Sequence, residues 1–212
     1  MSRDAGLQCR CGEVRGRLSN ASPAAVNRMV CYCDDCQAFL HSLGRADLLD
    51  RHGGTDIVQI APAALSIARG HERIAGLRLT PKGLYRWYAG CCNTPLGNTL
   101  RPAIPFVGIL ARVFEAGART PDDLFGAPIG AVHGKYAVGA APEGSRRLDL
   151  RLVGRGLGKI IVWRLRGQGW PHPYFDRATE TPSHPVTTLS QREREALRPL
   201  CGPHPAAGAA RR

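Results

Sequence analysis

At 212 residues, 43% of them apolar and 22% charged, the chain is long enough to bury the core of one domain with an extension. No run of about 18 apolar residues occurs, and the N-terminal MSRDAGLQCRCG lacks the apolar stretch of a secretory signal. We therefore expect a cytoplasmic protein with no membrane partner. In a reducing compartment, clustered cysteines indicate metal or redox sites before disulfides.

The formal net charge is +12, and arginine carries nearly all of it, since Lys82, Lys135 and Lys159 are the only lysines. Such a charge is typical of polyanion-binding surfaces. The arginines are, however, spread along the chain without a dense block or interleaved aromatic residues. Together with abundant Ala, Gly and Pro, this pattern favours compositional bias over a nucleic-acid partner.

Short apolar segments separated by turn residues predict a mainly β fold of short antiparallel strands. The predicted strands are, in chain order, Glu13–Leu18, Ala25–Cys33, Asp56–Ala61, Leu65–Ala68, Ile74–Thr80, Leu84–Ala89, Ile104–Phe114 and Ile129–Val138. One segment differs from this pattern: Gln37–Leu43 is predicted to form a short helix, with Asp34 or Asp35 as its N-cap. A ligand-orienting or proton-accepting role is the alternative for these two carboxylates.

The remainder of the chain is predicted to form a partly helical C-terminal extension. We divide the chain into a cysteine-containing β domain (1–140), the extension (141–198) and a disordered tail (199–212). Within the extension we favour a helix over a strand for Leu157–Arg166, and Ser190 with Glu193 forms a capping box for a second helix in Thr188–Leu200. For the aromatic stretch Trp170–Phe175, docking onto the β domain is preferred to a lid.

Seven of the eight cysteines fall in three tight groups, which are Cys9 with Cys11, Cys31 with Cys33 and Cys36, and Cys91 with Cys92. Residues i and i+2 of an extended strand face the same side, so both sulfurs of a C-x-C pair can reach one ion. The C-x-x-C turn adds a third thiolate to the central group. Zinc prefers tetrahedral thiolate sites, so we expect metal rather than buried apolar cysteines or a thioredoxin-type redox pair.

Two zinc ions fit this arrangement better than one. Cys31, Cys33 and Cys36 have no evident fourth ligand nearby, and three protein ligands with one open position are typical of reactive zinc sites. The first pair requires distant partners, for which the third pair is the obvious source. The pattern thus predicts an open zinc site and a structural one.

These motifs resemble a known family. C-x-C-G-x-V-x-G (Cys9–Gly16), C-x-C-x-x-C (Cys31–Cys36) and a cysteine followed by N-T-P-L (Cys92–Leu96) are similar to the glutathione-dependent formaldehyde-activating enzymes, whose domain centromere protein V shares. The resemblance covers roughly residues 7–110. It implies a β-tent fold with two zinc ions, in which Cys31, Cys33 and Cys36 hold the labile zinc where glutathione binds, while Cys9, Cys11 and Cys92 are structural ligands.

The third motif departs from the family pattern F-C-x-x-C-G-T-P-L. Ala89 stands in place of its first cysteine, and Cys91 precedes the second. Adjacent strand residues point to opposite faces, so Cys91 can join the structural site only if the chain turns there, as Gly90 and Asn93 would allow. We favour Cys91 as the fourth structural ligand; a three-coordinate site, or Cys91 facing the other zinc, are the alternatives.

The resemblance implies a carbon–sulfur lyase, or a carrier, that handles a thiol adduct such as S-hydroxymethylglutathione at the open zinc. Gln37, Phe39 and Arg86 are the predicted substrate-binding residues, with core packing as the alternative for Phe39. A non-catalytic zinc-stabilised module that binds a protein partner or nucleic acid remains the competing interpretation. The sequence does not indicate an oligomeric state.

Overall fold

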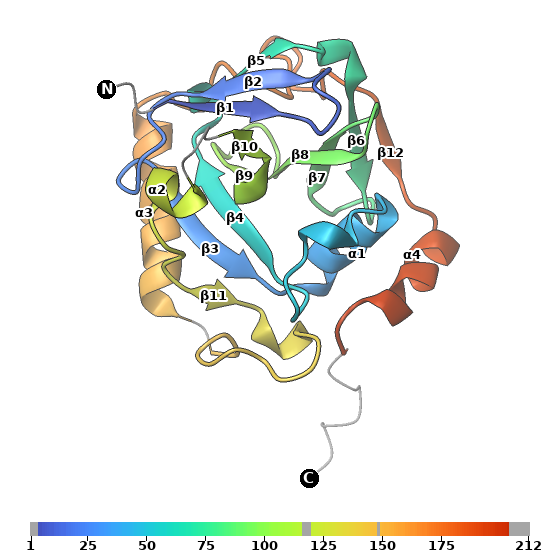
Figure 1. Ribbon diagram of the computed structural model, residues 1–212. Coiled ribbons are helices and arrows are strands. Elements are labelled where there is room, and N and C mark those ends of the chain that lie inside the picture. Colours follow the sequence, from blue (N-terminus) through green and yellow to red (C-terminus); the bar gives the residue numbers. More distant parts are fainter. Residues whose placement is uncertain (1–3, 116–119, 148, 204–212) are drawn as a thin grey trace.

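Two β-sheets and four α-helices make up the computed structural model, which describes residues 4–115, 120–147 and 149–203 (Figure 1). Within these residues the smaller sheet has the strand order β10-β1-β2-β5 and the larger one β11-β3-β4-β9-β8-β7-β6-β12. The smaller sheet comprises β1 (Ala5–Gln8), β2 (Arg15–Leu18), β5 (Leu65–Arg69) and β10 (Phe114–Glu115). The larger sheet comprises β3 (Asn27–Cys31), β4 (Thr55–Ile60), β6 (Ile74–Arg78), β7 (Tyr85–Ala89), β8 (Thr94–Thr99), β9 (Val107–Leu110), β11 (Ala131–Val132) and β12 (Val186–Thr188). The helices are α1 (Asp34–Ser42), α2 (Pro121–Phe125), α3 (Leu150–Leu165) and α4 (Gln191–Leu197).

The predicted mainly β fold is confirmed, but the larger sheet is mixed rather than purely antiparallel. Its two edge strands, β11 and β12, pair in parallel with β3 and β6. Both edge strands come from the C-terminal half of the chain and extend a sheet whose other strands lie between residues 27 and 110. None of the helices in the described part of the chain has the length and apolar character needed to cross a membrane.

Two predicted strands are interrupted. In Ile104–Phe114, a 3₁₀ turn at Ala111–Val113 separates β9 from β10, and the two strands belong to different sheets. In Ile129–Val138, only the two residues of β11 are extended, because His133 adopts a left-handed conformation (φ 60°) and a 3₁₀ turn follows at Gly134–Tyr136. The first interruption, Ala111–Val113, contains neither proline nor glycine, whereas Gly134 lies in the second.

The apolar core includes side chains from both sheets, such as Leu7 and Leu18 from the smaller sheet and Val58, Leu96 and Ile109 from the larger one. These five side chains are at most 1% exposed. Burial of this kind is the main stabilising contribution, at roughly 25 cal/mol per Å² of apolar surface.

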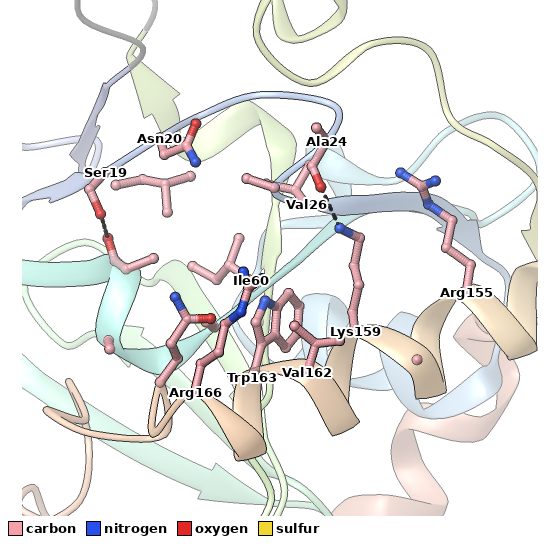
Figure 2. A pocket seen from close by; sticks show the side chains of 17 residues that line it. Ser19, Asn20, Ala24, Val26, Ile60, Arg155, Lys159, Val162, Trp163 and Arg166 are labelled. Atoms are coloured by element: carbon pink, nitrogen blue, oxygen red, sulfur yellow. Dashed lines mark hydrogen bonds between the residues drawn. The ribbon is translucent and has the colours of Figure 1, made fainter.

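The helix predicted in the extension is confirmed and is longer than predicted, beginning at Leu150 with Asp149 as its N-cap. Helix α3 lies along one side of the larger sheet (Figure 1). Long cationic side chains tie it to backbone carbonyls: Arg155 donates to Pro23 O and Lys159 to Ala24 O, at 2.9 and 2.6 Å. Figure 2 shows the Lys159 ammonium reaching that carbonyl. Part of the positive charge is therefore used to hold α3 in place.

The aromatic stretch 170–175 docks onto strands β7 and β8, as predicted. Tyr174 is fully buried, stacks on Trp87 with ring centroids 4.9 Å apart and donates its hydroxyl to Leu96 O at 2.7 Å. Phe175 meets Trp87 edge-on. Because Trp87 and Arg86 are adjacent on β7, their side chains lie on opposite faces of the sheet.

The second predicted helix of the extension, α4, is confirmed with its capping box. It lies beside α1 (Figure 1), where Arg194 and Arg198 pair with Asp35 and Asp34 at 3.3 and 3.1 Å. The predicted disordered tail, 199–212, falls mostly outside the described residues. Within 199–203, Gly202 N donates to Gln37 Oε1 at 2.7 Å.

His172 makes the docking of residues 170–175 sensitive to pH. Its Nδ1 accepts a hydrogen bond from Tyr174 N at 3.1 Å, and burial lowers its pKa from 6.5 to about 4. Between pH 6.5 and about 4, the unfolded chain therefore binds a proton at His172 that the folded chain does not. The resulting stability is fully present above pH 6.5 and is lost as the pH falls through about 4.

We expect His172→Asn to be less stable than the wild type at pH 8, with the difference shrinking by on the order of 2–3 kcal/mol by pH 4. Urea unfolding of both proteins across this pH range measures the difference. The measured quantity is the difference in the free energy of unfolding between the two proteins. Any loss of bound metal in acid affects both proteins equally and therefore does not change this difference. A difference that stays constant with pH would show that His172 is not the titrating group.

Candidate metal centres

The triplet, defined as Cys31, Cys33 and Cys36, forms where β3 passes into α1. Cys31 is the last residue of β3, and the three sulfur atoms all lie within 4.8 Å of one another. The Cys31 and Cys36 sulfurs are 3.9 Å apart, and both side chains are buried. Spacing in the sequence thus brings three thiols to one point, as predicted.

The N-cap of α1 is Cys33, and the prediction of Asp34 or Asp35 as cap was wrong. Cys33 Sγ accepts a hydrogen bond from Cys36 N at 3.3 Å, which the extended backbone of Cys33 permits. The triplet therefore lies at the N-terminus of a nine-residue helix. The helix dipole there favours negative charge, and hence the thiolate form of the cysteines.

Arg86 is the cationic partner of the triplet. Its side chain is 2% exposed, and its Nη1 lies 3.8 Å from Cys36 Sγ and 3.5 Å from Asn98 Oδ1. Its Nη2 lies 3.8 Å from Asp35 Oδ2. Burial alone would lower the pKa of Arg86, but the nearby Cys36 and Cys33 raise it, so the guanidinium stays charged.

Among the three thiols, Cys36 carries the negative charge most readily. Hydrogen bonds from the Cys31 and Cys33 thiols, together with Arg86, hold the pKa of Cys36 well below its usual range despite burial. The pKa of Cys33 is correspondingly raised, because hydrogen bonds to Cys31 and Cys36 and burial all favour its neutral form. A second and third thiolate therefore require an additional cation at the same point.

A cavity of about 620 Å³ lies next to the triplet. Its lining includes all three triplet cysteines, Arg86 and Asn98, residues of β3 and β4, and the inner side of α3. The triplet is thus accessible from a space large enough for a small organic molecule, since ligand pockets are typically about 300–1,000 Å³.

Two of the predicted substrate-binding residues do not line this cavity. Gln37 is fully buried, and its side-chain amide donates to Tyr32 O and Tyr136 O at 2.8 and 2.9 Å, which ties α1 to the loop after β11. Phe39 packs in the core and lies under the Arg86 guanidinium, 5.5 Å from its ring centroid. Only Arg86 stands at the cavity as predicted.

The quartet, defined as Cys9, Cys11, Cys91 and Cys92, lies where the two sheets meet. Its sulfur atoms are within 4.8 Å of one another, with 3.5 Å between Cys9 and Cys11 and 3.2 Å between Cys11 and Cys91. Cys9 and Cys11 follow β1 of the smaller sheet, whereas Cys91 and Cys92 lie between β7 and β8 of the larger one. The first pair converges through a turn, with Gly12 N donating to Cys9 O, and not through an extended strand as predicted.

The chain does turn between β7 and β8, as required for Cys91 to join the group. Asn93 has a left-handed backbone (φ 57°) and donates its N–H to Ala89 O at 2.8 Å. This turn brings Cys91 Sγ to 3.9 Å from Cys9 Sγ. Burial opposes ionisation of Cys92, but its hydrogen bond with the Thr94 hydroxyl at 3.1 Å lowers the pKa to about 6.

Both clusters could hold a metal ion. Four ligands about 2.3 Å from a tetrahedral ion are about 3.8 Å apart, close to the sulfur separations in both groups. The quartet offers a closed set of four donors. In the described part of the chain, no fourth cysteine, histidine or carboxylate joins the triplet.

A sequence model of a family of unknown function, DUF6151, matches residues 1–176. The chain belongs to this family. The match includes both cysteine clusters and α3, and it ends after the docked stretch 170–175. No curated protein matches the chain. A structural genomics crystal structure of a Rhodobacter sphaeroides protein is similar to this chain, with 18% sequence identity and a TM-score of 0.39. The match covers 56% of this chain and 94% of that one. At this level of similarity, no function can be transferred.

Sequence reasoning missed the polar residues that support the two clusters. Asn98, which contacts Arg86, is its cross-strand partner in the β7–β8 register. Thr94, beside Cys92, also accepts from Arg10 N at 3.0 Å. The pairing of Asn98 with Arg86 depends on strand register, and the contact of Thr94 with Arg10 joins residues far apart in the chain. Single-sequence patterns supply neither kind of information.

We expect Cys11→Ser to lose one bound metal per chain and to lower the free energy of unfolding by about 3 kcal/mol or more, because the quartet joins the two sheets. Elemental analysis and urea unfolding of the purified protein measure the two effects. Cys201→Ser is the matched control, since Cys201 belongs to neither cluster. Equal metal content in both variants would contradict a metal at the quartet.

We expect Arg86→Met to weaken metal binding at the triplet by about 10- to 100-fold, because the cationic partner of the thiolates is lost while the side-chain volume is largely kept. Chelator competition measures the affinity of each site. The quartet serves as the internal control, and its affinity should not change. Equal weakening at both sites would indicate a general loss of folding instead.

Proposed function

We propose that the protein is a zinc protein of β-tent type, in which the quartet holds a structural ion and the triplet a reactive one. The open zinc would bind a small thiol such as glutathione and handle its adduct with an aldehyde, a carbon–sulfur lyase reaction. The observation that carries this proposal is the triplet itself: three thiols at the wall of a 620 Å³ cavity, with no fourth ligand among the described residues.

The donor chemistry fits zinc. Thiolates are soft ligands that zinc accepts in tetrahedral sites, and the two cluster sizes correspond to a closed and an open coordination shell. When bound, zinc would lower the pKa of an incoming thiol and present it as the nucleophilic thiolate.

Arg86 would balance the charge of the loaded triplet. Three thiolates and a divalent cation leave one net negative charge, and the buried guanidinium offsets it. Asp35 and Asn98 hold Arg86 in place. This fixed cation would also favour the thiolate form of a bound thiol over its neutral form.

The cavity would bind the organic part of the thiol. Lys135 lines it together with Arg86, so a thiol with carboxylates, such as glutathione, would meet positive charge. In the reaction itself, a sulfur–carbon bond forms as the aldehyde π electrons move to oxygen, which takes up the proton of the thiol. The step is not a redox reaction, and its reverse releases the aldehyde.

Cys33→Ser gives a sharp test of this proposal. Serine is a good N-cap, so the hydrogen bond from Cys36 N and the start of α1 are kept while one metal ligand is lost. We expect zinc to fall from two ions per chain to one, with little change in stability. Elemental analysis and thermal unfolding measure these effects, again with Cys201→Ser as the control.

The open position is tested by titrating glutathione into protein loaded with Co²⁺, whose absorption reports a change of ligand. We expect the spectrum of the wild type to change and that of Cys33→Ser to stay constant. If no thiol perturbs the spectrum, the triplet is a structural site and the protein a non-catalytic zinc module.

A further inference from the structure

Most of the lining of the cavity beside the triplet is apolar. The triplet, Arg86 and Asp35 form one polar group in this lining, as their mutual contacts show, and Gln59, His133 and Lys135 are further polar lining residues. The sheet contributes Met29 and Ile57, and Phe106 lies on the segment leading into β9. On the opposite wall, α3 contributes only apolar or small residues, among them Val153, Gly156 and Ile160.

Such walls match a hydrocarbon better than a peptide. A glutathione backbone has amides along its whole length, and although Arg86 and Lys135 would meet its carboxylates, the amides would lose hydration against the apolar side chains. A hydrocarbon chain gains about 0.8 kcal/mol per buried methylene at the same surface, which is roughly a four-fold gain in affinity. The site thus favours a molecule with one reactive end and an apolar body.

We propose that the triplet site takes a thiol, or a thiol adduct, with a hydrocarbon body that lies between α3 and the larger sheet. This inference rests on the proposed function, since the sulfur of the ligand is placed at the open coordination position. It narrows the substrate class from small thiols in general to apolar ones. Helix α3 becomes the element that determines specificity.

Gly156 is the residue of α3 that faces Asn27 and Gln59 of the larger sheet. A Cβ atom placed there would lie 3.4 Å from Asn27 Nδ2 and 3.5 Å from Gln59 Oε1, which is ordinary contact. Because Gly156 lines the cavity, a longer side chain at this position would take up part of its volume. Glycine at position 156 therefore leaves the space that the hydrocarbon body would occupy.

The same helix provides two matched control positions. A Cβ at Gly154 or Gly158 would meet nothing within 4 Å, and both residues are exposed. Gly158 borders a second pocket of about 520 Å³ on another side of α3 (Figure 2), where Lys159 contacts Ala24 O. The described residues that line this second pocket include no cysteine, histidine or carboxylate.

The experiment titrates 1-alkanethiols, from ethanethiol to hexanethiol, and glutathione into Co²⁺-loaded protein and follows the absorption of the triplet site. In the wild type we expect the affinity to rise about two- to four-fold per methylene. Gly156→Leu should weaken hexanethiol binding by about ten-fold or more while leaving ethanethiol binding nearly unchanged.

Gly154→Leu and Gly158→Leu replace glycine by the same residue on the same helix and gain the same helix propensity. Because neither position lines the cavity beside the triplet, both variants should bind every thiol as the wild type does. Thermal unfolding and metal content verify that each variant folds. Ile160→Trp, which narrows the cavity from a second position, replaces Gly156→Leu if that variant does not fold.

The outcomes separate the two proposals. Affinity that is independent of chain length, or equal effects of the three leucine substitutions, would overturn the apolar-substrate inference and leave the open zinc site standing. If no thiol changes the absorption, the open site fails and this inference fails with it. Chain-length dependence that only Gly156→Leu and Ile160→Trp abolish supports both.

Discussion

Crowding of thiols is the constraint on which this structure depends. Seven sulfur atoms lie in two groups, each within 4.8 Å. At such distances like charges repel strongly, so the thiols of one group cannot all ionise unless a cation joins them. The quartet forms between the ends of two sheets, and the triplet forms between a strand and a helix. In both places a bound cation would turn a repulsive arrangement into a crosslink.

Part of the positive charge of the chain has local structural partners. Arg86 compensates the triplet, Arg194 and Arg198 pair with the carboxylates in the first turn of α1, and Arg155 and Lys159 anchor α3 to backbone carbonyls. These side chains have local partners and do not form one continuous cationic surface by themselves.

The local parts of both sites could be predicted from the sequence, and the distant parts could not. Cys31, Cys33 and Cys36 converge because their spacing fits a strand end and a helix start. The turn that brings in Cys91 was indicated by Gly90 and Asn93, residues that tolerate unusual backbone conformations. By contrast, the roles of Asn98 and Gln37 depend on strand register and on partners far along the chain, such as Tyr136 and Gly202. Patterns of polarity along one segment do not carry that information.

The difference between the clusters follows from what surrounds them. Cys9 is 1% exposed and accepts a backbone hydrogen bond from Val14, and the quartet supplies four donors from two sheets, so an ion there would have a complete set of protein ligands. The triplet supplies three donors from one short stretch of chain, and its fourth side faces a cavity. In the proposed function, an ion held by the triplet would keep one coordination position open to this cavity. Since α3 forms the far wall of that cavity, the ligand that fits there is determined by a helix outside the segment that carries the cysteines.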